Sequence, residues 1–178
     1  FLGIFGGGTG CRAAVAVGSG HILGLGRAGP ANIASDVGVA RDNILRAARE
    51  ALTIATGSDA ALADLAAGLA LAGANAAGAA EALRGALPFP RLRIETDAFG
   101  AVKGALGRRD GIVAAIGTGS VFASQRGGVI RQIGGWGLVL GDEGSGARLG
   151  RSLLAAALGA VDGFRAMTPL LRAVLDDH

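Results

Sequence analysis

The chain has 178 residues and is 51% hydrophobic, so it can bury a sizeable core and belongs to the globular class rather than the disordered one. Its net charge of +3 comes with scattered arginines, and 4% aromatic residues with no tyrosine argue against a nucleic-acid surface. Every long apolar stretch meets a charge before about 18 residues, which argues against a membrane span, and the single cysteine, Cys11, excludes an internal disulfide and favours a reducing, cytoplasmic setting.

The chain opens with three short apolar runs separated by glycine turns, which is the pattern of an antiparallel meander. These runs are residues 2–5, 12–17 and 21–25. A helix is predicted next, because apolar residues recur at helical spacing between a cap at Ser35 or Asp36 and a stop at Gly57. The following segments alternate between strand and helix, which favours parallel pairing of the later strands. They are a strand within 62–73, a helix over 75–87, a strand over 91–97 and a helix over 98–107.

The opening pattern returns in the second half of the chain. Residues 111–135 are again typical of a strand, a Gly-Thr-Gly turn, a second strand, a glycine turn and a third strand. Helical segments are predicted from about Glu143 and over 163–177. This repeat of architecture predicts two related α/β lobes, residues 1–107 and 108–178.

The two predicted lobes differ in how they finish. The first returns to its sheet with two further strands, whereas the second stops at His178 before any such return. We therefore expect a fragment in which the second lobe is incomplete. The sequence begins at Phe1 inside a strand-like run, without an initiator methionine or a basic and apolar leader, so no targeting peptide is expected.

The two Gly-Thr turns are candidates for phosphate binding. Glycine lets the backbone approach a phosphate closely and aim successive N–H groups at one point, and the threonine hydroxyl adds a donor. A single glycine turn is more often an ordinary hairpin. The repeated strand, turn and strand unit favours two tips that hold one polyphosphate. The candidate residues are Gly7, Gly8 and Thr9 in the first half and Gly117, Thr118 and Gly119 in the second.

Other motifs for phosphate binding or nucleophilic catalysis are weaker. The only lysine, Lys103, does not stand in a Walker loop. Residues 24–29 match the pattern GxGxxG but open no helix, so we interpret the match as chance. The two histidines, His21 within a strand-like run and His178 at the end, do not favour a Ser-His-Asp triad.

Four further residues are candidates for binding or catalysis, each with an ordinary structural alternative. Asp97 follows a predicted strand, at the edge where open α/β sheets bind ligands, but it could simply cap the next helix. Asp142 lies in a glycine-rich loop before a helix and has the same alternative. Trp136, in that loop, is more often a core anchor than a sugar platform. Asn32 is by default a turn residue.

Several segments together resemble a known family. They are "GGGTGCRAAVA", "GPAN", "AGANAAG", "ETDAFGA", "AAIGTGSVFA" and "GGWGLVLGDEGSGARLGR". In their order the chain resembles the BadF/BadG/BcrA/BcrD ATPase family, and within it the N-acetylglucosamine and glucosamine kinases. The resemblance implies an α/β fold of the actin, hexokinase and sugar-kinase superfamily, in which two ribonuclease H-like lobes with mixed sheets and helices flank an ATP cleft.

The resemblance also implies roles for the candidate residues. The two Gly-Thr turns would bind the nucleotide phosphates, and Asp97 would be the catalytic base. Contacts to sugar hydroxyls fall on Asn32, Gly134, Gly135 and Asp142, with Trp136 nearby. The implied reaction is transfer of phosphate from ATP, with Mg²⁺, to the 6-hydroxyl of N-acetylglucosamine or glucosamine. The expected partners are therefore the amino sugar and ATP, with no nucleic acid or membrane, and a homodimer is considered as the assembly.

Two departures from the family pattern bear on activity. Where the family reads "DGGGT", this chain has Phe5, and a phenyl ring offers no ligand to Mg²⁺. The family also continues past His178 into segments that hold adenosine, so we expect impaired kinase activity. Two alternatives stay open. One is a non-catalytic sugar-binding or regulatory module, and the other is an activator-type ATPase of the same family, against which the lone Cys11 argues because a cluster needs several cysteines.

Overall fold

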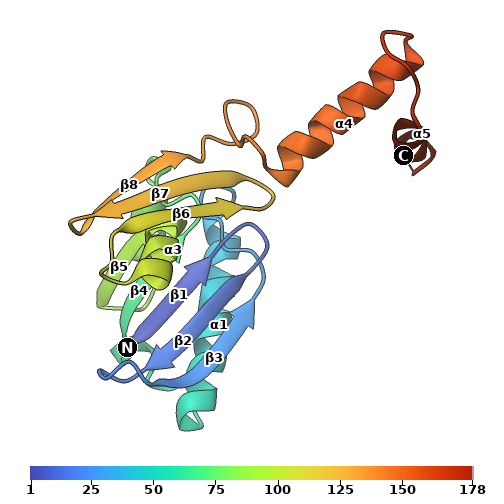
Figure 1. The fold of residues 1–178 in the computed structure, drawn as a ribbon. Coiled ribbons are helices and arrows are strands. Elements are labelled where there is room, and N and C mark those ends of the chain that lie inside the picture. Colours follow the sequence, from blue (N-terminus) through green and yellow to red (C-terminus); the bar gives the residue numbers. More distant parts are fainter. Residues whose placement is uncertain (178) are drawn as a thin grey trace. The chain divides into compact units, whose positions relative to one another are not determined.

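The computed structural model describes residues 1–177, and His178, at the chain end, lies outside the described residues. The chain divides into two compact units, of which the first covers Phe1–Arg108 and the second begins at Arg109. Each unit combines a β-sheet with helices (Figure 1). The expected mixed α/β class is therefore confirmed.

The first unit is built on a five-stranded sheet with the strand order β3-β2-β1-β4-β5 (Figure 1). Its strands are β1 (Leu2–Gly6), β2 (Cys11–Ala16), β3 (Ile22–Ala28), β4 (Ala66–Leu71) and β5 (Arg91–Thr96). The first three strands pair antiparallel, and β4 and β5 extend the sheet in parallel with β1. The expected meander and the expected parallel pairing are both confirmed.

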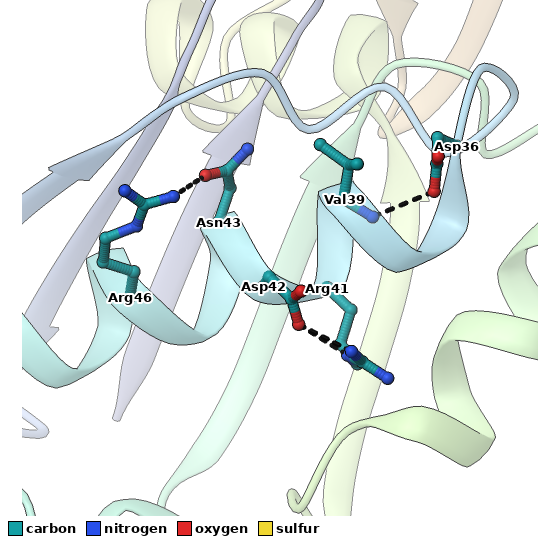
Figure 2. Close-up of polar contacts among 6 residues, drawn as sticks. All are labelled: Asp36, Val39, Arg41, Asp42, Asn43 and Arg46. Atoms are coloured by element: carbon teal, nitrogen blue, oxygen red, sulfur yellow. Dashed lines mark hydrogen bonds and ion pairs between the residues drawn. The ribbon is translucent and has the colours of Figure 1, made fainter.

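The long helix α1 (Val37–Thr56) follows the meander. Of the two caps that the sequence allows, Asp36 is the one used, and its carboxylate accepts a hydrogen bond from the Val39 N–H at 2.9 Å (Figure 2). The helix ends where expected, at Gly57, which has a φ of 81° that favours glycine.

The core of the first unit lies between α1 and one face of the sheet. Alternate residues of the strands are buried there, as the two-residue period of a strand requires. Gly24 and Gly26 of β3 let the helix approach the sheet backbone, because a Cβ at either position would collide with a carbonyl oxygen of α1. The fully buried residues include Ile33, Ile44, Ala47, Ala48, Ala51 and Leu71.

The remaining helical elements of the first unit are η1 (Leu62–Asp64), α2 (Ala79–Ala86) and α3 (Asp97–Leu106). The helix predicted over 75–87 starts later than expected, because Gly78 has a φ of 76° and turns take up the residues before it. The helix α3 packs on β4 at the sheet face opposite α1, where a Cβ on Gly100 would collide with the Ala70 side chain.

The second unit contains a three-stranded antiparallel sheet and two helices (Figure 1). Its elements are β6 (Gly111–Ile116), β7 (Ser120–Arg126), β8 (Val129–Gly134), α4 (Gly146–Val161) and α5 (Pro169–Asp177). The repeated strand, turn and strand pattern of the sequence is therefore seen in both units. None of the helices within residues 1–177 is both long enough and apolar enough to cross a membrane.

Both helices of the second unit begin later than the sequence predicts. The helix α4 starts at Gly146 rather than near Glu143, because Ser145 is its cap and accepts a hydrogen bond from the Arg148 N–H at 3.1 Å. The helix α5 starts at Pro169 rather than at residue 163. Proline is suited to the first turn of a helix, where its missing N–H costs nothing.

Candidate active site

The first Gly-Thr turn joins β1 to β2 and is closed by its own backbone. The Gly7 N–H donates to the Gly10 carbonyl at 2.9 Å, and the Gly7 carbonyl accepts from the Ala31 N–H at 2.9 Å. A Cβ on Gly7 or Gly8 would meet nothing within 4 Å. Within residues 1–177 no hydrogen bond takes the N–H of Gly8 or Thr9. The turn therefore offers open space and unused donors, as a phosphate site needs.

The carboxyl ends of β1, β4 and β5 lie at one edge of the sheet (Figure 1). In the register of these parallel strands, Gly6 lies beside Leu71 and Leu71 beside Thr96. The first turn follows Gly6 and Asp97 follows Thr96, so the structure brings both to the same edge. Ligands of open α/β sheets bind at this kind of edge.

Asp97 is the first residue of α3 but not its cap. The cap is Thr96, whose hydroxyl accepts a hydrogen bond from the Phe99 N–H at 3.2 Å. The half-buried Asp97 carboxylate accepts at Oδ1 from the Ala98 N–H at 2.8 Å. The capping alternative for Asp97 is therefore wrong, because the neighbouring threonine takes that role.

Asn32 reaches the same edge through the backbone. The Ile33 N–H donates to the Ala72 carbonyl at 3.0 Å, just beyond the end of β4. The Asn32 Oδ1 accepts from the Ala34 N–H at 3.0 Å, which is the expected behaviour of a turn asparagine. Position 73 must be a glycine to leave room for the Asn32 side chain, because a Cβ on Gly73 would lie 2.5 Å from the Asn32 Oδ1.

The loop that carries Asn32 is anchored by the first turns of α1. The Asn43 Nδ2 donates to the Pro30 carbonyl at 2.7 Å, and the Asn43 Oδ1 accepts from the Arg46 guanidinium (Figure 2). Asn43 is buried, and the two hydrogen bonds satisfy the polar atoms of its side chain, as a buried amide requires. This role of Asn43 could not be predicted from the sequence, because a polar side chain on the buried face of a helix meets its partner only after folding.

Phe5 lies on the sheet face opposite the core and is 44% exposed. Its ring lies about 3.3 Å from the position that a Cβ on Gly100 of α3 would occupy. In the same row of the sheet, beyond Ala70, stands Glu95, whose carboxylate pairs with Arg93 at 2.7 Å.

These residues do not fit a Mg²⁺ ion anchored from β1. The side chain at position 5 has no oxygen ligand, and Glu95 is two strands away and already paired. Residues 1–177 contain no group of three or more His, Cys, Asp or Glu side chains that could hold a metal.

The second Gly-Thr turn rests on the start of α4. The Gly117 N–H donates to the Gly119 carbonyl at 2.9 Å. The Gly117 carbonyl accepts from the Gly146 N–H at 2.8 Å, and the Thr118 carbonyl accepts from the Ala147 N–H at 3.1 Å. The turn thus uses donors that a helix start leaves without intrahelical partners.

Asp142 supports this second turn directly. Its Oδ1 accepts from the Ser120 N–H at 3.2 Å, and a Cβ on Gly119 would lie 3.1 Å from its Oδ2. Its φ of 61° is in the left-handed region, which aspartate tolerates better than most residues. The capping alternative for Asp142 is wrong, because Ser145 caps α4.

The remaining candidates of the second unit follow β8. Gly134 pairs with Val121, the second residue of β7, and both Gly134 and Gly135 have positive φ angles, 78° and 75°. Gly134 therefore lies beside the beginning of β7, the strand that follows the second turn, and Gly135 comes directly after it. Trp136 is 72% exposed, so the core-anchor alternative is wrong.

Comparison with known proteins identifies the family. Residues 2–174 match the BadF/BadG/BcrA/BcrD ATPase family. The chain belongs to this family.

Two curated proteins are similar to this chain in sequence. Glucosamine kinase GspK of Vibrio cholerae is 37% identical over 177 residues, which are 99% of this chain and 60% of that protein. The N-acetylmuramic acid/N-acetylglucosamine kinase of Clostridium acetobutylicum is 37% identical over 73 residues, 40% of this chain and 24% of that protein. The chain spans about three fifths of the length of GspK.

Solved structures agree with the fold expected for this family. A protein of Chromobacterium violaceum, provisionally named an N-acetylglucosamine kinase, has a TM-score of 0.88 at 35% identity over 98% of this chain and 62% of its own. A protein of Porphyromonas gingivalis with the same provisional name has a TM-score of 0.70 at 30% identity, over 99% and 61%. The expected fold of the actin, hexokinase and sugar-kinase superfamily is confirmed.

Proposed function

We propose that this chain carries part of the active site of an ATP-dependent kinase that phosphorylates N-acetylglucosamine or glucosamine at the 6-hydroxyl. The main support is the Asp97 carboxylate, which is not a helix cap and follows β5 at the sheet edge that also bears the first phosphate turn. The names of the relatives support the substrate class. In this proposal residues 1–107 and 108–178 act as the two lobes of the kinase.

The reaction needs a base and a set of phosphate donors. Asp97 accepts the proton of the sugar hydroxyl while the oxygen of that hydroxyl forms a bond to the γ-phosphorus. The bond between the γ-phosphorus and the β,γ-bridging oxygen breaks, and ADP is released. The free N–H groups of Gly8 and Thr9 bind phosphate oxygens, and the turn of Gly117, Thr118 and Gly119 is the second phosphate contact.

The sugar contacts in this proposal are polar groups and one aromatic ring. A buried sugar hydroxyl must find a hydrogen-bond partner, and the Asn32 amide and the Asp142 carboxylate can each supply one. The exposed Trp136 can cover an apolar face of the sugar. The proposed contacts are Asn32, Gly134, Gly135, Trp136 and Asp142.

The proposal also covers the metal ion, the cellular compartment and the oligomeric state. We include Mg²⁺ as an ion that the nucleotide carries on its phosphates, because Phe5 supplies no ligand for it. The cytoplasm is the proposed compartment, supported by one buried cysteine without a disulfide partner. A homodimer is the proposed assembly, which sedimentation analysis of the purified chain tests.

The experiment is a coupled assay of ADP release with N-acetylglucosamine or glucosamine as acceptor. Replacing Asp97 by Asn keeps the size of the side chain but removes the base, so kcat should fall by a factor of about 10² or more while the sugar still binds. Thr96→Ser, which keeps the cap, is the matched control. An unchanged kcat in Asp97→Asn would remove the residue from the base role.

Phe5 carries a second part of the proposal, which is a reduced rate. A version extended to the length of the relatives and carrying Phe5→Asp should turn over faster than the same version with Phe5, because a carboxylate is restored where the family motif has one. Equal rates of the two forms in the ADP assay would contradict the expected impairment.

A non-catalytic sugar-binding module is the second candidate, and Phe5 is the observation that favours it. Calorimetry separates the two, because such a module binds amino sugar without releasing ADP from ATP.

A further inference from the structure

Two arginines stand side by side next to the first turn. Arg12 of β2 pairs with Arg27 of β3, and Arg12 also pairs with Phe5 of β1. Cys11 and Ala13, on either side of Arg12, are buried in the core, so Arg12 lies on the opposite face of the sheet. The three paired residues therefore share one row and one face.

This row is adjacent to the turn that is proposed to bind phosphate. The next row of the sheet is Gly6, Cys11 and Ala28, and it is the last row before the turn. One residue of a strand rises by about 3.3 Å, so the arginine backbones begin within that distance of the turn's root. Their long side chains can reach a phosphate held there.

The positive charge of this pair is not balanced within the described residues. Within residues 1–177 the guanidinium groups of Arg12 and Arg27 make no ion pair, and Glu50 accepts only the backbone N–H of Arg27 at 2.7 Å. Like charges directly opposite each other in a sheet are destabilising. Phe5 adds no negative charge to the row.

The unbalanced pair and the unused donors of the turn point to an anion. We infer that Arg12 and Arg27 neutralise the phosphates of the nucleotide at the first turn, in place of a metal ion oriented from β1. Arginine suits this task, because its guanidinium donates two parallel hydrogen bonds to phosphate and keeps its charge at every accessible pH. The inference rests on the proposed function in taking a nucleoside triphosphate as the ligand.

One consequence is that phosphate binding does not require Mg²⁺. A metal ion on the phosphates competes with the arginines for the same oxygens, so affinity should stay the same or rise when the metal is removed. A carboxylate at position 5 would reverse this, because it would pair with Arg12 and repel phosphate unless a metal bridged the two anions.

The test is calorimetry on the 178-residue chain with inorganic tripolyphosphate and with ATP, each in MgCl₂ and in EDTA. Tripolyphosphate reports the phosphate site without any adenosine contact. We expect the chain to bind it in EDTA, and Arg12→Gln to weaken that binding by about tenfold, because the variant loses a hydrogen bond between two charged groups. Arg27→Gln should weaken it less, because β3 lies one strand further than β2 from the turn that joins β1 to β2.

Matched variants exclude a merely structural effect. Arg91→Gln removes an exposed arginine from the far end of β5 and should leave binding unchanged. Arg12→Lys should retain part of the affinity. Arg12→Gln should raise the Tm in phosphate-free buffer, because it relieves the repulsion between the two cations. Phe5→Asp should make tripolyphosphate binding depend on MgCl₂.

The outcomes distinguish this inference from the kinase proposal. Binding that needs MgCl₂, binding that the Arg12→Gln/Arg27→Gln double variant leaves unchanged, or no binding of tripolyphosphate at all would each overturn the inference. A chain that binds tripolyphosphate through these arginines but releases no ADP supports the inference and contradicts the kinase activity. A chain that releases ADP, and whose Arg12→Gln/Arg27→Gln double variant keeps its affinity for tripolyphosphate, supports the kinase activity and contradicts the inference about the arginines.

Discussion

The two Gly-Thr turns have similar sequences but are held in place by different parts of the protein. In the first, Gly6 is buried at the root of the turn, and its carbonyl accepts from the Ala72 N–H at 2.9 Å. In the second, the residue at the same ladder position is Ile116, which is 59% exposed. Support there comes from the start of α4 and from Asp142.

Two turns with the same sequence motif can thus be stabilised by different neighbours. The first turn is held from within the sheet by the loops that follow β3 and β4. The second is held from its side by a loop that lies more than twenty residues further along the chain. A change in the core should therefore disturb the first turn, and a change in the glycine-rich loop should disturb the second.

The largest effect is expected for Gly6→Ala. The new Cβ would lie 2.7 Å from the Ala31 Cβ and 2.9 Å from the Leu71 Cδ2, and both neighbours are fully buried. Overpacking of this kind costs about 2–3 kcal/mol of the free energy of unfolding. Urea denaturation measures it, and Gly3→Ala on the same strand, where a Cβ meets nothing within 4 Å, is the control. Equal stability of the two variants would show that the root of the turn is not tightly packed.

A smaller effect concerns the first residue after each turn. These residues are Cys11 and Ser120, and both are buried. The Ser120 hydroxyl has a partner, because it donates to the Glu143 carbonyl at 2.9 Å. At Cys11, burial raises the pKa of the thiol to about 11. The folded state therefore favours the neutral thiol. The neutral Cys11 thiol makes its full contribution to the free energy of unfolding below pH 9, the ordinary pKa of a cysteine. This contribution is lost as the pH rises from 9 toward 11.

By pH 10 this loss should reach about 1.4 kcal/mol, because one pKa unit corresponds to that free energy. Thermal or urea unfolding between pH 8 and pH 10 measures it. Cys11→Ala should lack this component, and a pH dependence identical in both proteins would assign the loss to other groups. The same raised pKa should keep Cys11 unreactive toward iodoacetamide in the folded chain.

The smallest effect is expected for Asp142→Ala. The variant loses the acceptor of the Ser120 N–H and keeps a φ of 61° that alanine tolerates less well, so the second unit should lose about 1 kcal/mol. Asp142→Asn keeps a side-chain acceptor and tolerates the same backbone, so it should remain near the parent. Hydrogen exchange of the Ser120 amide measures the local effect. Unchanged protection in Asp142→Ala would show that the carboxylate does not hold the turn.

Much of the fold could be predicted from local patterns in the sequence. The three opening strands, the helix from Asp36 to Gly57 and the returning strands of the second half were all visible as spacing of apolar residues and glycines. The starts of α2, α4 and α5 were predicted too early. The residues before α2 are as small and apolar as the helix itself, and only the positive φ of Gly78 marks the boundary. At α4 and α5 several residues could begin the helix, and the structure uses the cap at Ser145 and the proline at Pro169.

The candidate site shows the same division. Residue type and order singled out Asp97, Asn32 and the two turns as candidates. They could not show that Thr96, rather than Asp97, caps α3, because both residue types make good caps. Nor could they reveal the exposure of Trp136, which depends on how the loop after β8 runs.

Local sequence is enough to define most of the strands and helices of this chain and the glycine turns between them, because hydrophobic period and turn chemistry act over a few neighbouring residues. The row shared by Arg12, Arg27 and Phe5 and the hydrogen bond between Asp142 and Ser120 exist only in the folded chain. Strand register and packing join residues that are far apart in the sequence, and no local pattern contains that information.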